Sequence, residues 1–292
     1  MVYHGRFTKT LLFVYSHQYP EFWKDGLWKA LKMLDKSQCV VDMVNLFYNE
    51  KPRFSEYRDI VAWGAFGSPA DNFVQSLGNR FADAKKILCI AGNAVPAQNL
   101  ETYDGFFCET DWYIKQLVQL TDNPFIFKAF GVNTEIFYPK NTGLDHIWDY
   151  LSVGSFSNWK RHEKIIDKPG SKMVIGEIQK GNLDESLDII GNLLINGVGV
   201  SDMVSPEKLS NIYNSSKKVY IPANVIGGGE RAVLEARYCG CEVEIEPDNQ
   251  KLKELMNLEK VPTHEDYYEA LKNGINYINY DSEKNGLKNV KR

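Results

Sequence analysis

The chain has 292 residues, of which 43% are hydrophobic and 25% are charged. This is the composition of a globular protein, and the length suits one large domain or two ordinary ones. The formal net charge of −4 excludes a strongly basic protein, so we expect no overall attraction to nucleic acid or anionic membranes.

The cysteines and the apolar runs indicate the compartment. Five cysteines are scattered along the chain, and the pair Cys239 and Cys241 has no second Cys or His pair at zinc-ligand spacing. The N-terminus lacks the charged-then-apolar pattern of a signal segment, and no apolar run approaches the length of a membrane span. We therefore expect a cytoplasmic protein with reduced cysteines and no transmembrane segment.

The first half alternates short apolar runs with segments of helical period, which is typical of α/β proteins. The predicted strands are residues 11–16, 39–46, 59–63, 87–91 and 105–108, and the predicted helices are 21–34, 70–77 and 111–120. The strands are almost continuously apolar, as expected for a parallel sheet that is buried on both faces.

The segment 131–143 lacks periodicity and contains Pro139 and Gly143, which is typical of an interdomain linker. A second alternating series follows it. Here the predicted strands are 150–153, 173–175, 198–200, 219–221 and 242–245, and the predicted helices are 187–194, 205–213, 230–238 and 265–273. We expect two Rossmann-like domains, 1–139 and 140–264, that face a central cleft, with the tail 265–292 packing back on the first.

Three consecutive glycines, Gly227, Gly228 and Gly229, precede the helix 230–238. Glycines let a backbone turn tightly and approach a ligand closely. The free N–H groups and the positive dipole end of the following helix favour a bound anion such as a diphosphate. The pattern predicts a phosphate-binding turn.

Glu235 lies five residues into that helix, beside Val233, Leu234 and Ala236. A carboxylate on an apolar helix face needs partners, because burying a charge alone is costly. The two hydroxyl groups of a ribose would satisfy it. A structural ion pair with Arg231, one helical turn earlier, would satisfy it equally well.

Four separated segments resemble the donor domain of GT-B-fold glycosyltransferases, in particular the retaining group called family four. They are Gly131–Pro139, Val153–Lys160, Val204–Pro222, and the glycine-rich turn with Leu234-Glu235-Ala236 and Gly240. The resemblance covers roughly residues 127–245, and the first half matches only in its rhythm of strands and helices. It implies transfer of a sugar from a nucleoside diphosphate sugar, with a UDP-sugar as donor, no metal or other cofactor, and retention at the anomeric carbon.

The resemblance also implies roles for single residues. Lys160 matches a lysine that binds the donor diphosphate, Arg161 beside it is expected to share that task, and Arg231 follows the phosphate-binding turn. Gly154 matches a glycine that admits the phosphate, whereas Ser155 stands where the family has an arginine. The alternative for Lys160 and Arg161 is a solvated basic turn.

The family's pair of glutamates is incomplete in this chain. Glu235 matches the second glutamate, which holds the ribose, but Gly227 stands in place of the first, which contacts the transferred sugar. Either sugar recognition is altered, with Glu230 as a substitute, or the enzyme is weak or inactive.

Polar residues follow the strands of the first half, where the acceptor is expected. His17 and Asn93 follow the first and fourth strands, and Glu109 and Asp111 follow the fifth. We take His17, Asn93 and Glu230 as candidate catalytic residues. A nearby set of aromatic residues could stack on a sugar or a base, or form core: Tyr15, Tyr19, Phe22, Trp23, Trp63 and Phe66.

No Asp-x-Asp or cluster of Asp, Glu and His in the sequence suggests a metal site. The expected function is a metal-independent glycosyltransferase acting on an unidentified acceptor hydroxyl of a glycan, lipid or modified nucleic acid. The alternatives are a GT-B-like nucleotide-binding protein with reduced catalysis, an epimerase of a nucleotide sugar, and a phage-type or viral-type enzyme acting on hydroxymethylated DNA bases.

Overall fold

The computed structural model describes residues 10–37, 39–92, 99–140 and 147–289, with the backbone only for 281–289. The chain divides into two compact units. Unit 1 contains Met1–Trp23, Leu27–Phe130 and His264–Arg292, and unit 2 contains Lys24–Gly26 and Gly131–Thr263. The segment 131–139, expected at the end of the first domain, therefore belongs to unit 2.

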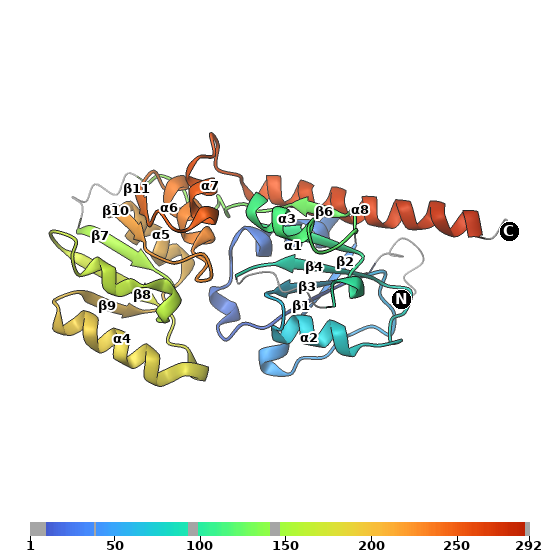
Figure 1. Ribbon diagram of the computed structural model, residues 1–292, viewed down its shortest axis with the longest axis horizontal. Coiled ribbons are helices and arrows are strands. Elements are labelled where there is room, and N and C mark those ends of the chain that lie inside the picture. The colour runs from blue at the N-terminus through green and yellow to red at the C-terminus, as the bar shows by residue number, and fades with distance from the viewer. Residues whose placement is uncertain (1–9, 38, 93–98, 141–146, 290–292) are drawn as a thin grey trace, which may run out of the picture. The chain divides into compact units, whose positions relative to one another are not determined.

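Unit 1 is built on a six-stranded sheet in the order β2-β1-β3-β4-β5-β6, and all its strand pairs are parallel (Figure 1). The strands are β1 (Thr10–Tyr15), β2 (Val40–Asn45), β3 (Asp59–Gly64), β4 (Lys85–Ile90), β5 (Gly105–Cys108) and β6 (Ile126–Lys128). The helices are α1 (Gly26–Ser37), α2 (Pro69–Ser76), α3 (Asp111–Leu117) and α8 (His264–Asn289).

Alternate residues of β1 point to opposite faces of this sheet, as the pleat of a strand requires. Leu11 and Phe13 pack with α1 and α8, whereas Leu12 and Val14 pack with α2 and α3. Both faces are therefore covered by helices, which explains why the strands are apolar throughout.

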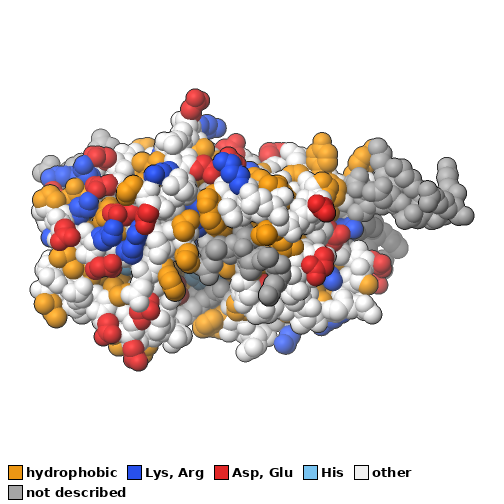
Figure 2. Space-filling model, viewed as in Figure 1, with side chains coloured by type: hydrophobic (Ala, Val, Ile, Leu, Met, Phe, Trp, Pro, Cys, Tyr) orange, Lys and Arg blue, Asp and Glu red, His pale blue; other side chains and the backbone are white. Residues whose placement is uncertain are grey.

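Unit 2 has a five-stranded parallel sheet in the order β11-β10-β7-β8-β9. The strands are β7 (Trp148–Val153), β8 (Lys172–Gly176), β9 (Gly199–Asp202), β10 (Ser216–Ile221) and β11 (Glu242–Ile245). The helices are α4 (Leu183–Ile195), α5 (Pro206–Asn214), α6 (Glu230–Tyr238) and α7 (Gln250–Met256). Figure 2 shows acidic and basic side chains interspersed on this unit, where Lys164 pairs with Glu246 and Lys168 with Glu244.

Most predicted elements are present with shifted ends, and two of the differences have a physical cause. The helix expected from residue 21 begins at Gly26, because the carbonyl of Lys24 accepts a bond from Asn133 and Gly26 packs on the backbone of Gly131. The helix expected to end at residue 273 continues to Asn289. Its Gly274 lies inside the helix, where an added Cβ would lie 2.6 Å from the Phe107 ring. The strand β6 and the helix α7 were not predicted from the sequence.

Candidate functional site

The glycine-rich turn leads from β10 into α6 with two left-handed residues. Gly228 has φ +73° and Gly229, the N-cap of α6, has φ +103°. A Cβ on Gly229 would also lie 2.7 Å from Ile221. Glycine is therefore required here, since other residues pay a steric cost in this region.

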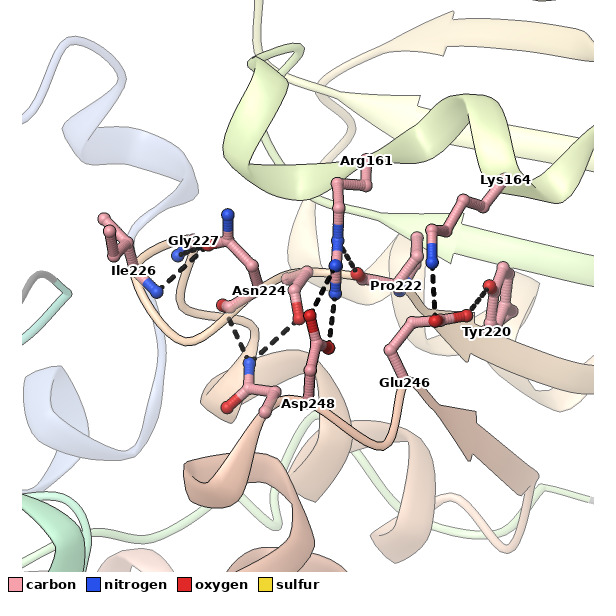
Figure 3. Close-up of polar contacts among 11 residues, drawn as sticks. Arg161, Lys164, Tyr220, Pro222, Asn224, Ile226, Gly227, Glu246 and Asp248 are labelled. Atoms are coloured by element: carbon pink, nitrogen blue, oxygen red, sulfur yellow. Dashed lines mark hydrogen bonds and ion pairs between the residues drawn. The ribbon is translucent and has the colours of Figure 1, made fainter.

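Two asparagines fix the approach to this turn (Figure 3). Oδ1 of Asn224 accepts hydrogen bonds from the backbone N–H groups of Ile226 and Gly227, at 3.0 and 2.8 Å. The fully buried Asn249 donates from Nδ2 to the carbonyls of Ala223 and Asn224, at 3.0 and 2.8 Å. Its Oδ1 accepts from Leu252 N and so caps α7. Asn224 therefore holds the loop from within, and Asn249 connects it to α7.

A second turn, Asn158–Lys160, packs directly on the glycine-rich turn. The Asn224 N–H donates to the Trp159 carbonyl at 3.0 Å. A Cβ on Gly227 would lie 2.2 Å from that same carbonyl oxygen and 3.1 Å from Cβ of Trp159. No side chain fits at position 227 in this arrangement, because Trp159 occupies its space.

Lys160 connects the two turns. Its stem crosses Gly154, where an added Cβ would lie 3.1 Å from Cδ and Cε of the lysine. Its ammonium lies near Gly228, since a Cβ built on that glycine would lie 3.5 Å from Nζ and 3.2 Å from Oε2 of Glu230. The structure thus brings together four residues named from two sequence segments: Gly154 and Lys160 from the first, and Gly228 and Glu230 from the second.

Figure 3 shows that Arg161 points to Pro222 and Asp248 rather than to Gly227. Its Nε donates to the carbonyl of Pro222 at 2.7 Å, and its two terminal nitrogens donate to Asp248 at 2.6 and 2.8 Å. Hydrogen bonding to Asp248 raises the pKa of the guanidinium further. A bidentate pair of this kind is geometrically specific. These bonds tie Arg161 to the segment that follows β10. They also occupy the guanidinium N–H groups that were expected to bind a diphosphate.

His162 holds the backbone after β7. The ring is buried, and Nε2 lies 3.3 Å from the Gly154 carbonyl and 3.2 Å from the Ser155 carbonyl. Carbonyls only accept, so Nε2 carries the proton and Nδ1 accepts from the Ser152 hydroxyl at 3.0 Å. Burial, with the charge of Lys160, lowers the pKa of His162 to about 4. The ring is therefore neutral near pH 7.

Glu230, considered as a substitute for the family's sugar-contacting glutamate, is buried with 3% of its surface exposed. Its Oε1 lies 2.6 Å from Nζ of Lys251, which is fully buried. The contact is an ion pair rather than an aligned hydrogen bond. One carboxylate oxygen of Glu230 is thus committed to Lys251, while the other faces Gly228.

Glu235 is buried within unit 2. The Tyr213 hydroxyl donates to its Oε2 at 3.4 Å. Burial raises the pKa of Glu235 to about 8, with the charge of Arg231 opposing the shift and that of Asp25 adding to it. The alternative partner proposed for Glu235, Arg231, forms an ion pair of 2.9 Å with Asp25. Glu235 is therefore a carboxyl group that lacks full compensation for its charge.

The candidates in the first half lie in unit 1. Nδ1 of His17 accepts a hydrogen bond from the Tyr19 N–H at 3.0 Å, so a neutral ring carries its proton on Nε2. This tautomer makes Nε2 a donor, not a general base. Asp111 lies in the first turn of α3 and pairs with Lys128 at 3.1 Å, and Glu109 directly follows β5. Asn93 lies outside the described residues.

The aromatic residues of unit 1 divide between the core and partly exposed positions. Trp23 is buried and stacks on Trp63 with ring centroids 5.3 Å apart, and Tyr15 lies 4.5 Å from Trp23. Tyr19 and Phe22 form a separate pair with centroids 6.2 Å apart. Of the two roles expected for these aromatic residues, Tyr15 and Trp23 have the second, since both form part of the core.

Asn224, Asn249, Lys251 and Tyr213 were not identified from the sequence. Asn249, three residues before Leu252 and six before Leu255, has the pattern of a helix N-cap, and this was the available signal. Lys251 gave none. In the described residues, no group of three or more His, Cys, Asp and Glu side chains is placed to hold a metal ion. Within the same residues, no helix has the length and apolar character needed to cross a membrane.

The chain was compared with protein families, curated proteins and known structures. No protein-family model matches the chain, and no curated protein matches it in sequence. Among known structures, HepE from Anabaena in complex with UDP and glucose matches with TM-score 0.60 at 12% identity, over 94% of this chain and 90% of HepE. Sucrose-phosphate synthase from Thermosynechococcus elongatus matches with TM-score 0.64 at 13% identity, over 93% of this chain and 91% of the synthase.

The chain has the GT-B fold. The expected α/β class with two Rossmann-like halves is thus confirmed, and the likeness extends over nearly the whole chain. The GT-B fold is not confined to transferases among its matches. UDP-GlcNAc 2-epimerase from Neisseria meningitidis, bound to UDP-GlcNAc, matches with TM-score 0.53 at 10% identity, over 93% of this chain and 92% of the epimerase. At these identities the fold is shared, and the chemistry must be argued from the residues.

Proposed function

We propose that this chain is a glycosyltransferase that takes a sugar from a UDP-sugar and transfers it to an acceptor hydroxyl. The observation that carries the proposal is the position of Lys160 between Gly154 and Gly228, at the N-terminus of α6. A lysine ammonium, two glycines whose backbone a phosphate can approach closely, and the positive end of a helix together form a site for a diphosphate. The UDP-bound structures of HepE support the choice of nucleotide.

In this proposal the diphosphate lies at Gly228 and Gly229, and Lys160 stabilises the negative charge that develops as it leaves. Glu235 accepts hydrogen bonds from the ribose hydroxyls. This would relieve a carboxyl group whose pKa burial raises to about 8. His162 positions Gly154 and Ser155 through their carbonyls. Arg161 holds the loop rather than the phosphate.

The proposal also includes metal-independent transfer, retention of the anomeric configuration and a role for His17. The residues above supply the positive charge at the leaving group, so we expect transfer to continue in the presence of EDTA. We also expect retention of the anomeric configuration, which NMR of the product tests. In unit 1, His17 contributes a hydrogen-bond donor at Nε2 to the acceptor.

The binding experiment compares two lysines. Wild-type protein, Lys160→Ala and Lys217→Ala are titrated with UDP by calorimetry. Lys217 pairs with Asp149 at 2.5 Å in the same unit and serves as the matched control. We expect Lys160→Ala to weaken UDP binding about 10- to 100-fold, since a charged contact to phosphate is lost. Equal affinities for all three proteins would remove Lys160 from the site, and absence of UDP binding to wild type would refute the proposal.

Two other functions are separated by product analysis. The epimerase among the structural matches favours epimerisation of a nucleotide sugar. The ion pair between Glu230 and Lys251 favours a nucleotide-binding protein with reduced catalysis. Wild-type protein is incubated with UDP-sugars and candidate acceptors, and the products are resolved by mass spectrometry and NMR. Release of UDP with a glycosylated acceptor indicates transfer. An isomerised UDP-sugar indicates epimerisation, and UDP binding without turnover indicates the binding protein.

A further inference from the structure

The indole of Trp159 stands beside the proposed diphosphate site and is half-exposed. Its exposed fraction is 52%, and neighbouring Ile226 on the glycine-rich loop is 39% exposed. Within the described residues, no aromatic ring packs on this indole, in contrast to Trp23 of unit 1. Trp159 directly precedes Lys160, so a large flat apolar surface adjoins the cation that the proposed function places on the diphosphate.

Three hydrogen bonds hold the backbone of the turn that carries Trp159. The Asn158 N–H donates to Oε1 of Glu185 at 2.9 Å, and the Trp159 carbonyl accepts from Asn224. The Lys160 N–H donates to the Ser157 carbonyl at 2.9 Å. These bonds hold the backbone of Trp159 in one position relative to the glycine-rich turn, which is the preorganisation that a recognition residue needs.

Trp159 also takes the space of the side chain that position 227 lacks. A Cβ on Gly227 would lie 2.2 Å from the carbonyl oxygen of Trp159 and 3.1 Å from its Cβ, so a side chain at position 227 would require the Trp159 turn to move. The glycine and the tryptophan are therefore coupled. At this end of the loop the group presented is an indole, and a carboxylate has no room.

The order of groups along the backbone assigns the ligand part that meets this indole. Glu235 lies in the second turn of α6, Gly229 caps its N-terminus, and Gly228 and then Gly227 follow away from the helix. With the ribose at Glu235 and the diphosphate at Gly228, the next group of a nucleotide sugar is the transferred sugar. It reaches Gly227 and Trp159.

We propose that Trp159 is a specificity-determining residue that packs its indole against the C–H face of the sugar carried by the donor. This inference rests on the proposed function. Sugar rings with equatorial hydroxyl groups present C–H bonds on their faces, and such faces pack on the flat surface of an indole. Recognition through an apolar face selects for ring shape and does not require a carboxylate to accept bonds from the sugar hydroxyls.

The test separates the sugar from the nucleotide. Wild type, Trp159→Ala, Trp159→Phe and the control Tyr138→Ala, an exposed aromatic of the same unit, are titrated with UDP and with UDP-glucose, UDP-galactose and UDP-N-acetylglucosamine. For the UDP-sugar that wild type binds best, we expect Trp159→Ala to weaken affinity about tenfold, as loss of one aromatic contact does. We expect its affinity for UDP to stay within about twofold and Trp159→Phe to retain most of the sugar-dependent gain.

The outcomes are distinct. Equal losses for UDP and UDP-sugar would place the indole on the nucleotide and overturn the inference. Unchanged affinity for both would overturn it as well. If wild type binds UDP but no UDP-sugar more tightly, the inference fails while the nucleotide site stands. If wild type binds neither, the proposed function fails and the inference falls with it. Circular dichroism and thermal melting of each variant check that the exposed substitution leaves the fold intact.

Discussion

Nζ of Lys251 lies 2.6 Å from Oε1 of Glu230, and the side chains are 0% and 4% exposed. The pair joins α7 to the first residue of α6, which directly follows the glycine-rich turn. Buried ion pairs contribute little net stability compared with apolar side chains, but removal of one partner leaves an uncompensated charge. The pair therefore makes the start of α6 sensitive to substitution.

We expect Lys251→Met to lower the free energy of unfolding by about 3 to 5 kcal/mol, because Glu230 would keep a buried charge without a partner. Urea denaturation at pH 7 measures the change. The double variant Glu230→Leu/Lys251→Met is the control, since it removes both charges and should recover most of the loss. A double variant as unstable as the single one would show that the lysine stem, not the charge pair, is responsible.

Glu235 predicts a dependence of stability on pH. Its pKa is about 8 in the folded protein against an ordinary value of 4.5, so the folded state holds the proton more tightly. Its favourable contribution is complete below about pH 4.5 and is lost as pH rises through 8. We expect the unfolding free energy of wild type to fall over this window relative to Glu235→Gln, measured by denaturation at several pH values.

The glutamine variant removes the titration while keeping an acceptor for the Tyr213 hydroxyl. Parallel pH profiles for the two proteins would contradict the assignment. Because ribose hydroxyls stabilise the ionised form, UDP binding to wild type should also release protons near pH 7, and that release should be absent in Glu235→Gln. Calorimetry in buffers of different ionisation enthalpy measures it.

Asn249 predicts a link between α7 and the glycine-rich turn. Asn249→Ala removes two hydrogen bonds to the carbonyls of Ala223 and Asn224 and the cap of α7. We expect a loss of about 2 to 3 kcal/mol in unfolding free energy and weaker UDP binding, because buried carbonyls lose their donors. Asn257→Ala, at the exposed end of the same helix, should change neither quantity. A normal UDP affinity in Asn249→Ala would show that the turn is held by other contacts.

A side chain at position 227 should disturb the contact between the glycine-rich turn and Trp159. A Cβ at position 227 would lie 2.2 Å from the Trp159 carbonyl oxygen, so Gly227→Ala must displace one of the two turns. We expect a destabilisation of about 1 to 3 kcal/mol with loss of UDP affinity. Gly181→Ala, where an added Cβ meets nothing within 4 Å, is the control. A stable, UDP-binding Gly227→Ala variant would show that the two turns separate easily.

The sequence by itself determined the architecture. Apolar runs alternating with helical periods predicted two parallel α/β series, because strands of such sheets are covered on both faces. The helix predicted over residues 230–238 is α6, with the same limits, because helix ends depend on neighbouring residues. Gly154 and Lys160 were named from one segment and Gly228 from another, and the fold brings the three together.

Only the tertiary structure decided the partners of the charged residues. Arg161 pairs with Asp248, Arg231 with Asp25 and Glu230 with Lys251, and these partners are distant in sequence or on another helix. Periodicity reports which face of an element is buried, but not which charge lies opposite. Likewise, only the structure shows that α8 continues through Gly274, which packs closely on the Phe107 ring. The close approach of the Trp159 backbone to Gly227 is also visible only in the structure.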